Sequence, residues 1–273
     1  MLLGIDIGGT TISLGLVQGT NIVKKECVPS FRKDAPLEET LEYLSDRIKE
    51  IITPAVTAMG VGVPTLVDPV RGIVYNAANI RSWTEVYLKD FLQDRFGVRA
   101  EVNNDANCYA LGASALLGHP CHVTVCVTLG TGTGIGIVVD GKLMCGENCG
   151  SGELCSVPYL DSEYESYCSK KFFTAAGMDG RKAAEAAAAG DPATHQFFRE
   201  FGHHMGEFLT LVMYAYDPGC IVLGGGIANT APWFMDSMME TLRNRYIYPR
   251  SIDRLQIKVM PEDNVPLLGA SLL

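Results

Sequence analysis

The chain has 273 residues, of which 47% are hydrophobic, and its formal net charge is −9, from 22 Lys and Arg against 31 Asp and Glu. This length allows one large domain or two modest ones, each with its own core. The acidic charge argues against nucleic acid as a partner, because affinity for a phosphate backbone depends on Lys and Arg contacts.

The N-terminus and the apolar runs argue against secretion and membrane insertion. Residues 1–6 contain no charged region followed by an apolar one, so we expect no signal peptide. No uninterrupted apolar run approaches the roughly 20 residues of a membrane span. The nine Cys are odd in number and scattered, which suits reduced thiols better than a disulfide framework. We therefore expect a cytoplasmic protein.

Strand and helix patterns alternate in the first half of the chain. Residues 3–7 and 12–17 have the composition of strands, with a Gly/Thr turn between them. Over residues 37–52, Leu and Ile recur at alternating steps of four and three, which predicts an amphipathic helix. A strand, a helix, a strand and a helix are then expected at residues 58–63, 85–96, 98–102 and about 106–117.

The second half begins with a similar pattern. Strands are expected at residues 123–129 and 135–139, on either side of a loop of alternating Gly and Thr. Residues 143–166 are irregular. A long helix at residues 193–216 and a short buried strand at 220–223 follow, and three glycines end that strand.

The beginning of the second half repeats the beginning of the first. Residues 3–20 can be placed on residues 125–142 without a gap, and most apolar positions then coincide. We therefore predict a duplicated strand–turn–strand unit, in two similar domains whose glycine turns face one cleft. The identities are Gly8 with Gly130, Thr11 with Thr133, Val17 with Val139, and Gly19 with Gly141.

The two Gly/Thr turns are candidates for phosphate binding. Glycine lets the main chain approach a polyphosphate closely, and the exposed N–H groups and hydroxyls can bind its oxygens. Neither turn is a Walker A loop, which requires Gly-Lys-Ser/Thr at the start of a helix. Each turn alone is also typical of an ordinary hairpin, but the pair favours nucleotide binding.

Two carboxylates lie in or beside predicted strands. Asp6 interrupts an apolar run, where a carboxylate is costly unless it meets a partner, so it is a candidate Mg²⁺ contact, directly or through water. Its alternative is to cap the neighbouring turn. Asp105 lies where open α/β sheets bind ligands, and it could deprotonate an attacking hydroxyl in phosphoryl transfer. Its alternative is to cap the helix that begins at Ala106.

Residues 143–169 are rich in carboxylates and thiols. Carboxylates suit a polyhydroxyl ligand, because each oxygen can accept from adjacent hydroxyls; a solvated acidic loop is the alternative. Four thiols could bind zinc. Their spacings match no Cys-x2-Cys pair, so we expect free thiols and no zinc site. These thiols belong to Cys145, Cys149, Cys155 and Cys168.

Taken in order, these motifs resemble those of the ROK family (repressors, open reading frames and kinases). The resemblance covers nearly the whole chain, from a first phosphate turn at Gly4–Thr10 to a closing helix at Leu267–Ala270. The other matching segments are Gly62–Pro64, Asn79 with Trp83, Asn104–Asn107, Val127–Gly132, Gly152–Leu154, Glu165 with Tyr167 and Ser169, and Val222–Gly226.

The resemblance implies an α/β fold of the actin/hexokinase type (ribonuclease H-like), duplicated in two domains with a cleft between them. We expect a small N-terminal domain at residues 1–112, completed by a C-terminal helix at 263–273, and a larger domain at 113–262. The family also implies a homodimer.

The resemblance further assigns roles to residues. Asp105 is the implied catalytic base, and Asp6 the implied Mg²⁺ contact. The implied sugar-binding residues are Gly62, Pro64, Asn79, Asn104, Glu153 and Glu165. The implied ATP-binding residues are Asp6, Gly8, Gly9, Thr10, Thr11, Gly130, Thr131, Gly132, Thr133, Gly224, Gly225 and Gly226.

The chain departs from the family pattern at three places. Cys155 and Ser156 occupy the positions of a Gly-His pair whose His typically serves both zinc and sugar. The Cys-rich zinc loop is missing, because only a short segment separates Ser156 from Glu165, so we expect no structural zinc. Thr11 stands where many members carry Lys, so a phosphate contact is weaker or replaced.

The sequence therefore predicts an ATP- and Mg²⁺-dependent kinase that phosphorylates a hexose, with glucose and its 6-hydroxyl as the first candidates. N-acetylmannosamine, allose and fructose are alternative substrates. A sugar-sensing regulator, a sugar-binding protein without turnover and an ATPase of the same fold are alternatives from other classes. The regulators carry an N-terminal helix-turn-helix, for which the turn at Gly8 leaves no room.

Overall fold

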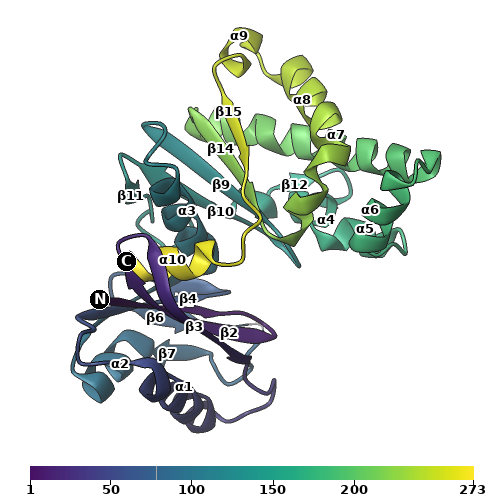
Figure 1. The fold of residues 1–273 in the computed structure, drawn as a ribbon. Helices are drawn as coiled ribbons and strands as arrows, with labels where there is room; N and C mark the ends of the chain where they lie inside the picture. Colours follow the sequence, from purple (N-terminus) through teal and green to yellow (C-terminus); the bar gives the residue numbers. More distant parts are fainter. Residues whose placement is uncertain (78) are drawn as a thin grey trace. The chain divides into compact units, whose positions relative to one another are not determined.

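In the computed structural model, which describes residues 1–77 and 79–273, the chain forms two compact units. Unit 1 comprises Met1–His119, Gly141–Ser151 and Asp263–Leu273, and unit 2 comprises Pro120–Asp140 and Gly152–Glu262. The chain therefore leaves unit 1 twice and ends in it. Figure 1 shows this return, since the last helix, in yellow, lies against the first strands, in purple.

Unit 1 is built on a five-stranded sheet of order β3-β2-β1-β4-β8. Strand β1 pairs antiparallel with β2 and parallel with β4, and β4 pairs parallel with β8. The carboxyl ends of three neighbouring strands therefore lie at one edge. The strands are β1 (Leu2–Ile7), β2 (Thr11–Gln18), β3 (Asn21–Pro29), β4 (Ala58–Val63) and β8 (Arg99–Asn104).

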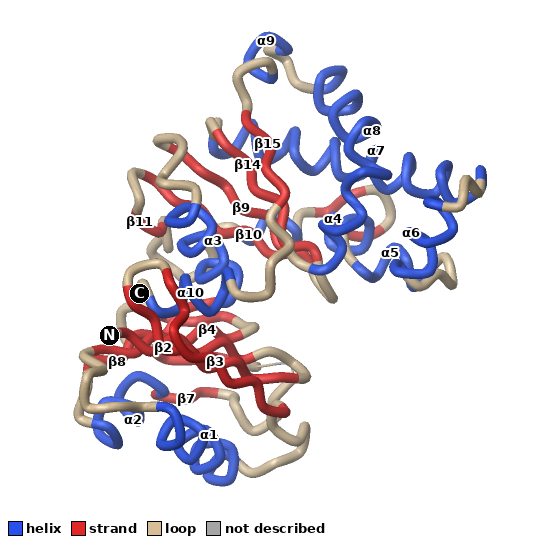
Figure 2. The backbone as a smooth tube through the Cα atoms, in the orientation of Figure 1, coloured by secondary structure: helices blue, strands red, loops and turns tan. Residues whose placement is uncertain are grey.

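Helices cover both faces of this sheet, as Figure 2 shows. Apolar residues of α1 and α2 join the core of the sheet, while α3 and α10 pack together on the other face. The helices are α1 (Leu37–Ile51), α2 (Leu88–Phe96), α3 (Asp105–Leu116) and α10 (Val265–Ser271). Short strands complete the unit: β5 (Leu66–Asp68), β6 (Ile73–Tyr75), β7 (Glu85–Tyr87) and β11 (Lys142–Leu143).

Glycines let α10 lie directly on the backbone of unit 1. A Cβ atom at Gly60 of β4 would lie 1.8 Å from the carbonyl oxygen of Ala270. A Cβ atom at Gly269 would lie 1.6 Å from the carbonyl oxygen of Cys108 in α3. No side chain fits at either position, so the helix contacts both the sheet and α3 at backbone distance.

Unit 2 contains strands β10, β9, β14 and β15 in that order. Strand β9 is antiparallel to β10 and parallel to β14, which repeats the arrangement of β2, β1 and β4. The predicted duplication of the strand–turn–strand unit is thus confirmed. The strands are β9 (Val123–Leu129), β10 (Thr133–Val139), β14 (Cys220–Gly224) and β15 (Gln256–Val259).

The ungapped alignment of the two repeats is wrong by one residue in the second strand. Ile7 pairs with Ile12 across the first turn, whereas Leu129 pairs with Thr133 across the second. The second turn is therefore one residue shorter, and Thr133 is the structural counterpart of Ile12, not of Thr11. The Thr11–Thr133, Val17–Val139 and Gly19–Gly141 identities do not mark equivalent positions.

Helices and short segments surround the second sheet. The long helix predicted at residues 193–216 is confirmed as α7 (Pro192–Tyr216), which packs on α8 (Ala231–Arg245). The others are α4 (Tyr164–Cys168), α5 (Lys170–Ala175), α6 (Gly180–Ala188), α9 (Pro249–Ile252), the 3₁₀ segments η1 (Glu153–Ser156) and η2 (Gly226–Thr230), and strands β12 (Pro158–Tyr159) and β13 (Ser162–Glu163).

Most predicted elements of unit 1 are present, with one partial error. The helix predicted at residues 37–52 is confirmed as α1, and the one from about 106 as α3. The helix predicted at 85–96 begins only at Leu88, because residues 85–87 form β7 and pair with β6. Within residues 1–77 and 79–273, no helix combines the length and apolar composition needed to cross a bilayer.

Trp83 is buried in unit 1, and its indole Nε1 donates a 2.7 Å hydrogen bond to Oγ1 of the buried Thr40. Thr40→Val is expected to lower the free energy of unfolding by about 1–3 kcal/mol, because it leaves a buried N–H without its acceptor. Urea unfolding measures the change, with the exposed Thr53→Val as control. Equal losses in both variants would contradict the prediction.

Candidate functional site

Polar residues of unit 1 gather at the carboxyl ends of β1, β4 and β8. Asp6 pairs with Gly62 across β1 and β4, and Gly62 pairs with Asn103 across β4 and β8. A Cβ atom at Gly62 would lie 3.7 Å from Oδ1 of Asp6, so the carboxylate lies directly over this glycine. Strand β8 ends at Asn104 and α3 begins at Asp105, which places both carboxylates at the same edge.

Asn104, not Asp105, is the N-cap of α3. Its Oδ1 accepts hydrogen bonds from the backbone nitrogens of Ala106 at 2.8 Å and Asn107 at 3.4 Å. Its Nδ2 donates to the carbonyl oxygen of Thr65 at 3.0 Å, which leaves one amide hydrogen for a further acceptor. The alternative that Asp105 is the cap is therefore wrong, although its Oδ1 also accepts from Ala106 N, at 2.8 Å.

The carboxyl group of Asp6 lies in an environment that disfavours its charge. Burial raises the pKa of Asp6 to about 6, while nearby Lys25 lowers it and Asp263 raises it. A buried carboxylate of this kind gains from a nearby cation, which favours the ionised form.

Asp6 makes the stability of unit 1 depend on pH. Because its folded-state pKa lies above the ordinary value of 3.8, its neutral form stabilises the fold at low pH, and this contribution is lost as the pH rises through about 6. Asp6→Asn stays neutral, so without divalent cations it is expected to exceed the wild type at pH 8 by about 1–3 kcal/mol of unfolding free energy.

Urea unfolding at pH 8 and near pH 4 tests this prediction, because the difference should shrink toward zero at the lower pH. The exposed Asp90→Asn is the control and should show no such trend. A difference that is the same at both pH values would refute the prediction.

The first Gly/Thr turn is fixed by one residue that the sequence did not reveal. Gly8 N donates to the carbonyl oxygen of Thr11 at 2.8 Å. Ser30, the residue after β3, closes the turn: its Oγ donates to Gly8 O at 2.7 Å and its N donates to Thr10 O at 2.9 Å. A Cβ atom at Gly9 would lie 3.2 Å from Nδ2 of Asn79, so the exposed turn lies beside a predicted sugar-binding residue.

The second Gly/Thr turn is held by the segment that follows Glu165. Gly130 N donates to Gly132 O at 2.9 Å, and Lys170 N donates to Gly130 O at 2.9 Å. Thr133 Oγ1 donates to the carbonyl oxygen of Cys168 at 2.8 Å. The turn and the start of α5 therefore form one hydrogen-bonded structure.

Glu165, predicted to bind sugar, lies against this second turn. Its Oε2 accepts from Thr133 N at 3.3 Å, and a Cβ atom at Gly132 would lie 2.5 Å from the same oxygen. Its carboxylate also forms an ion pair with Lys171. Glu153 lies near enough that burial and the charge of Glu165 both raise its pKa. The structure thus brings the two predicted sugar-binding carboxylates of unit 2 together.

A cavity of about 500 Å³ in unit 2 lies beside the second turn. Its backbone wall comes from the turn and from η2, where the third glycine motif ends. Of that motif only Gly226 lines the cavity, because Gly224 is buried in β14. The lining residues are Gly130, Thr131, Lys170, Phe173, Met178, Gly180, Arg181, Ala184, Gly226, Ile227, Asn229 and Thr230.

Sequence reasoning missed most of this cavity. The wall formed by α5, α6 and the turn between them carries Phe173, Met178 and Ala184, which belong to none of the sequence motifs. The cavity combines an apolar wall, a glycine turn and two cationic side chains, Lys170 and Arg181. This combination suits an aromatic ring system that carries phosphates.

All nine cysteines are free thiols. Cys155 and Cys168 are buried in the core of unit 2, and burial raises the pKa of both thiols. Cys145 lies in unit 1, where it accepts a 3.7 Å hydrogen bond from Asn103 Nδ2. Across residues 1–77 and 79–273, no group of three His, Cys, Asp or Glu side chains is arranged to hold a metal ion.

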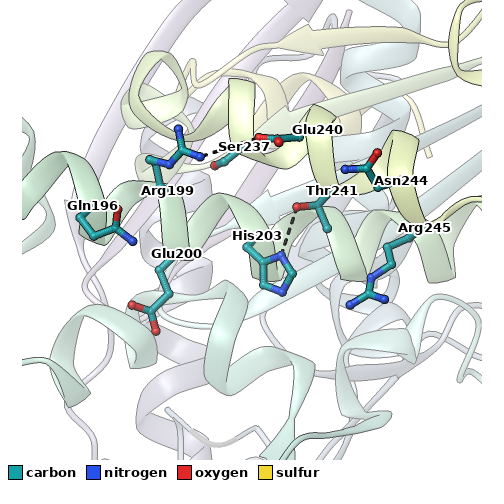
Figure 3. A pocket seen from close by; sticks show the side chains of 9 residues that line it. All are labelled: Gln196, Arg199, Glu200, His203, Ser237, Glu240, Thr241, Asn244 and Arg245. Carbon is teal, nitrogen blue, oxygen red and sulfur yellow. Dashed lines mark hydrogen bonds and ion pairs between the residues drawn. The ribbon is translucent and has the colours of Figure 1, made fainter.

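A second cavity, of about 560 Å³, lies between α7 and α8 (Figure 3). The side chains that line it are all polar, and His203 Nδ1 lies 3.1 Å from Thr241 Oγ1 in its middle. It contains none of the residues singled out from the sequence, and it offers no glycine turn or apolar wall. Its chemistry therefore differs from that of the cavity beside the second turn.

Comparisons with known proteins point in the same direction as the fold. The family model described as the ROK family matches residues 2–172 and 169–273. A glucokinase of Thermotoga maritima is 27% identical over an alignment of 306 positions, and the match covers 99% of this chain and 96% of the glucokinase. A xylose repressor of Bacillus spizizenii is 26% identical over an alignment of 298 positions, and the match covers 98% of this chain and 75% of the repressor.

Among solved structures, a ROK family glucokinase from Streptomyces griseus in complex with glucose and AMPPNP is similar, with a TM-score of 0.81 and 26% identity. The match covers 99% of this chain and 97% of the glucokinase chain. The predicted α/β fold of the actin/hexokinase type is thereby confirmed.

Proposed function

The chain belongs to the ROK family, and from this membership we propose that it is an ATP-dependent kinase that phosphorylates a hexose. Glucose and its 6-hydroxyl are the first candidates, because the similar proteins of Thermotoga maritima and Streptomyces griseus are glucokinases. N-acetylmannosamine, allose and fructose are the alternative substrates. The position of two carboxylates, Asp6 and Asp105, at one sheet edge of unit 1 supports the reaction type.

In this proposal, Asp105 accepts the proton of the sugar hydroxyl as that oxygen attacks the γ-phosphorus of ATP. The observation that supports this role most directly is the capping of α3 by Asn104, since the helix does not depend on Asp105 for its cap. Asn104 and Asn79 orient the sugar in unit 1, next to the loop at Gly62 and Pro64. Glu153 and Glu165 supply the acceptors from unit 2.

We assign the nucleotide to the glycine turns. In unit 2, Gly130–Thr133 binds phosphates, and the cavity beside this turn binds the nucleoside. Gly226 lines that cavity, and it follows Gly224 and Gly225 at the end of β14. In unit 1, Gly8–Thr11 binds phosphates. The N–H groups of glycine-rich turns suit both tasks, because they approach an anion without a side chain in the way.

Mg²⁺ is the metal that fits the residues present. Its usual protein sites hold it through one or two carboxylates together with substrate phosphates, so the single carboxylate of Asp6 is a sufficient protein contact, directly or through water. The raised pKa of Asp6 fits a group that awaits a cation. When bound, the metal would neutralise charge on the phosphates.

The ROK family also contains regulators, and the similarity to a xylose repressor raises the alternative of a sugar sensor. The match covers 98% of this chain and 75% of that repressor. Phosphoryl transfer separates the two functions, since a sensor binds sugar without consuming ATP.

The first test is an assay of ADP release with MgATP and a panel of hexoses and N-acetylhexosamines. A kinase will release ADP only when its sugar is present, and the ratios of kcat/KM rank the substrates. Absence of turnover with every sugar, with sugar binding still measurable by calorimetry, would replace the kinase by the sensor.

A further inference from the structure

The charged side chains that line the cavity beside the second turn are all cationic. Its apolar surface comes from side chains such as Phe173, Met178 and Ile227, while Lys170 and Arg181 are cationic. No Asp or Glu is among the residues that the structure describes as lining it. An occupant that complements this surface has an apolar planar part and an anionic part.

Lys170 is attached to the turn itself. Its backbone N donates to Gly130 O at 2.9 Å, so the Cα of Lys170 is held at a fixed place beside Gly130 and Thr131. Its exposed side chain makes no ion pair with any residue in the described ranges 1–77 and 79–273. The neighbouring Lys171 differs, since it pairs with Glu163 and Glu165 and does not line the cavity.

Arg181 is the second cation of the cavity, and it is less firmly placed. It lies in α6, its side chain is 89% exposed, and its Nε donates to Glu185 at 3.3 Å. Part of its charge is thereby already balanced. Lys170 is therefore the better placed of the two cations that line the cavity to meet phosphates on the second turn.

We infer that Lys170 is a phosphate ligand of the bound nucleotide, which supplements the backbone N–H groups of the second turn. This inference rests on the proposed function only in taking the occupant as a nucleoside polyphosphate. An ammonium group beside the turn offsets the negative charge of the phosphates. Removing the ammonium should weaken phosphate binding and leave the nucleoside part unchanged.

The experiment compares Lys170→Met, which keeps the aliphatic stem, with Lys182→Met, an exposed lysine of α6 that does not line the cavity. Calorimetry measures the Kd of ADP, and displacement of ADP by adenosine gives the affinity of the part without phosphate. Lys170→Met is expected to raise the Kd of ADP about tenfold and to change that of adenosine less than about twofold. Lys182→Met should leave both unchanged, and Lys170→Arg should restore ADP binding.

The outcomes separate this inference from the proposed reaction, because binding is measured without turnover. If no sugar is phosphorylated but ADP binding still depends on Lys170, the inference stands and the kinase does not. If sugar is phosphorylated and Lys170→Met binds ADP like the wild type, the inference is overturned. Equal losses for ADP and adenosine would also overturn it, since they would indicate a general distortion of the cavity.

Discussion

Asp105→Asn is expected to lower kcat by about 10²–10⁴-fold, with little change in the Kd of sugar or ATP. The loss has this size because a positioned general base contributes about that factor, and an amide cannot accept the proton of the attacking hydroxyl. The variant keeps the shape of the side chain, and the cap of α3 belongs to Asn104, so the helix should start at the same residue. Steady-state ADP release measures kcat, and calorimetry measures both Kd values.

The matched control for this experiment is Asp94→Asn, which removes an exposed carboxylate from α2 in the same unit. It should retain full activity. If Asp105→Asn keeps more than about a tenth of the wild-type kcat, Asp105 is not the base. A loss of sugar affinity that accounts for the whole effect would instead make Asp105 a binding residue.

Gly269→Ala is expected to lower the free energy of unfolding by about 3–5 kcal/mol, although it adds only one methyl group. The new Cβ atom would lie 1.6 Å from the carbonyl oxygen of Cys108, a backbone atom that cannot turn away. Helix α10 would have to move off α3, and its contact with the sheet at Gly60 would open as well. Urea unfolding of the whole chain measures the change.

Gly150→Ala in the same unit is the control, because its new Cβ atom would lie 3.9 Å from the carbonyl oxygen of Asn148, an ordinary contact distance. It should change the unfolding free energy by less than about 0.5 kcal/mol. If Gly269→Ala is equally harmless, the close contact between α10 and α3 does not exist in solution.

The sequence predicted the elements that local composition determines. The strands around the two Gly/Thr turns, helix α1 with its regular Leu and Ile spacing, and helix α7 were all found in place, because period and turn residues act over a few positions. The one-residue difference between the turns was missed. It is defined by cross-strand pairing, which an ungapped alignment of side-chain types does not measure.

Contacts between distant residues lay beyond sequence reasoning. Glu165 contacts Gly132 and Thr133, although some thirty positions separate them in the sequence. The motifs assigned Glu165 to the sugar and the two turn residues to phosphate, so this contact was not predicted. The apolar wall of the nucleotide cavity was missed for the same reason. Phe173 belongs to the core of unit 2 and Met178 packs against it, and only the fold shows that both also line the cavity with Gly130. The sequence motifs therefore predicted the glycine turn of the cavity, but not the side chains that pack around it.

The return of the chain to unit 1 has a consequence for the order in which the protein forms on the ribosome. Helix α10 follows all of unit 2 in the sequence, yet its backbone lies on Gly4, Gly60 and Gly112 of unit 1. During synthesis, one glycine-lined face of the first sheet therefore stays uncovered until residues 265–271 have left the ribosome. Unit 2 is complete in the sequence before α10, so a chain that ends at residue 264 and has been released from the ribosome should have a protease-resistant second unit and a protease-sensitive first one.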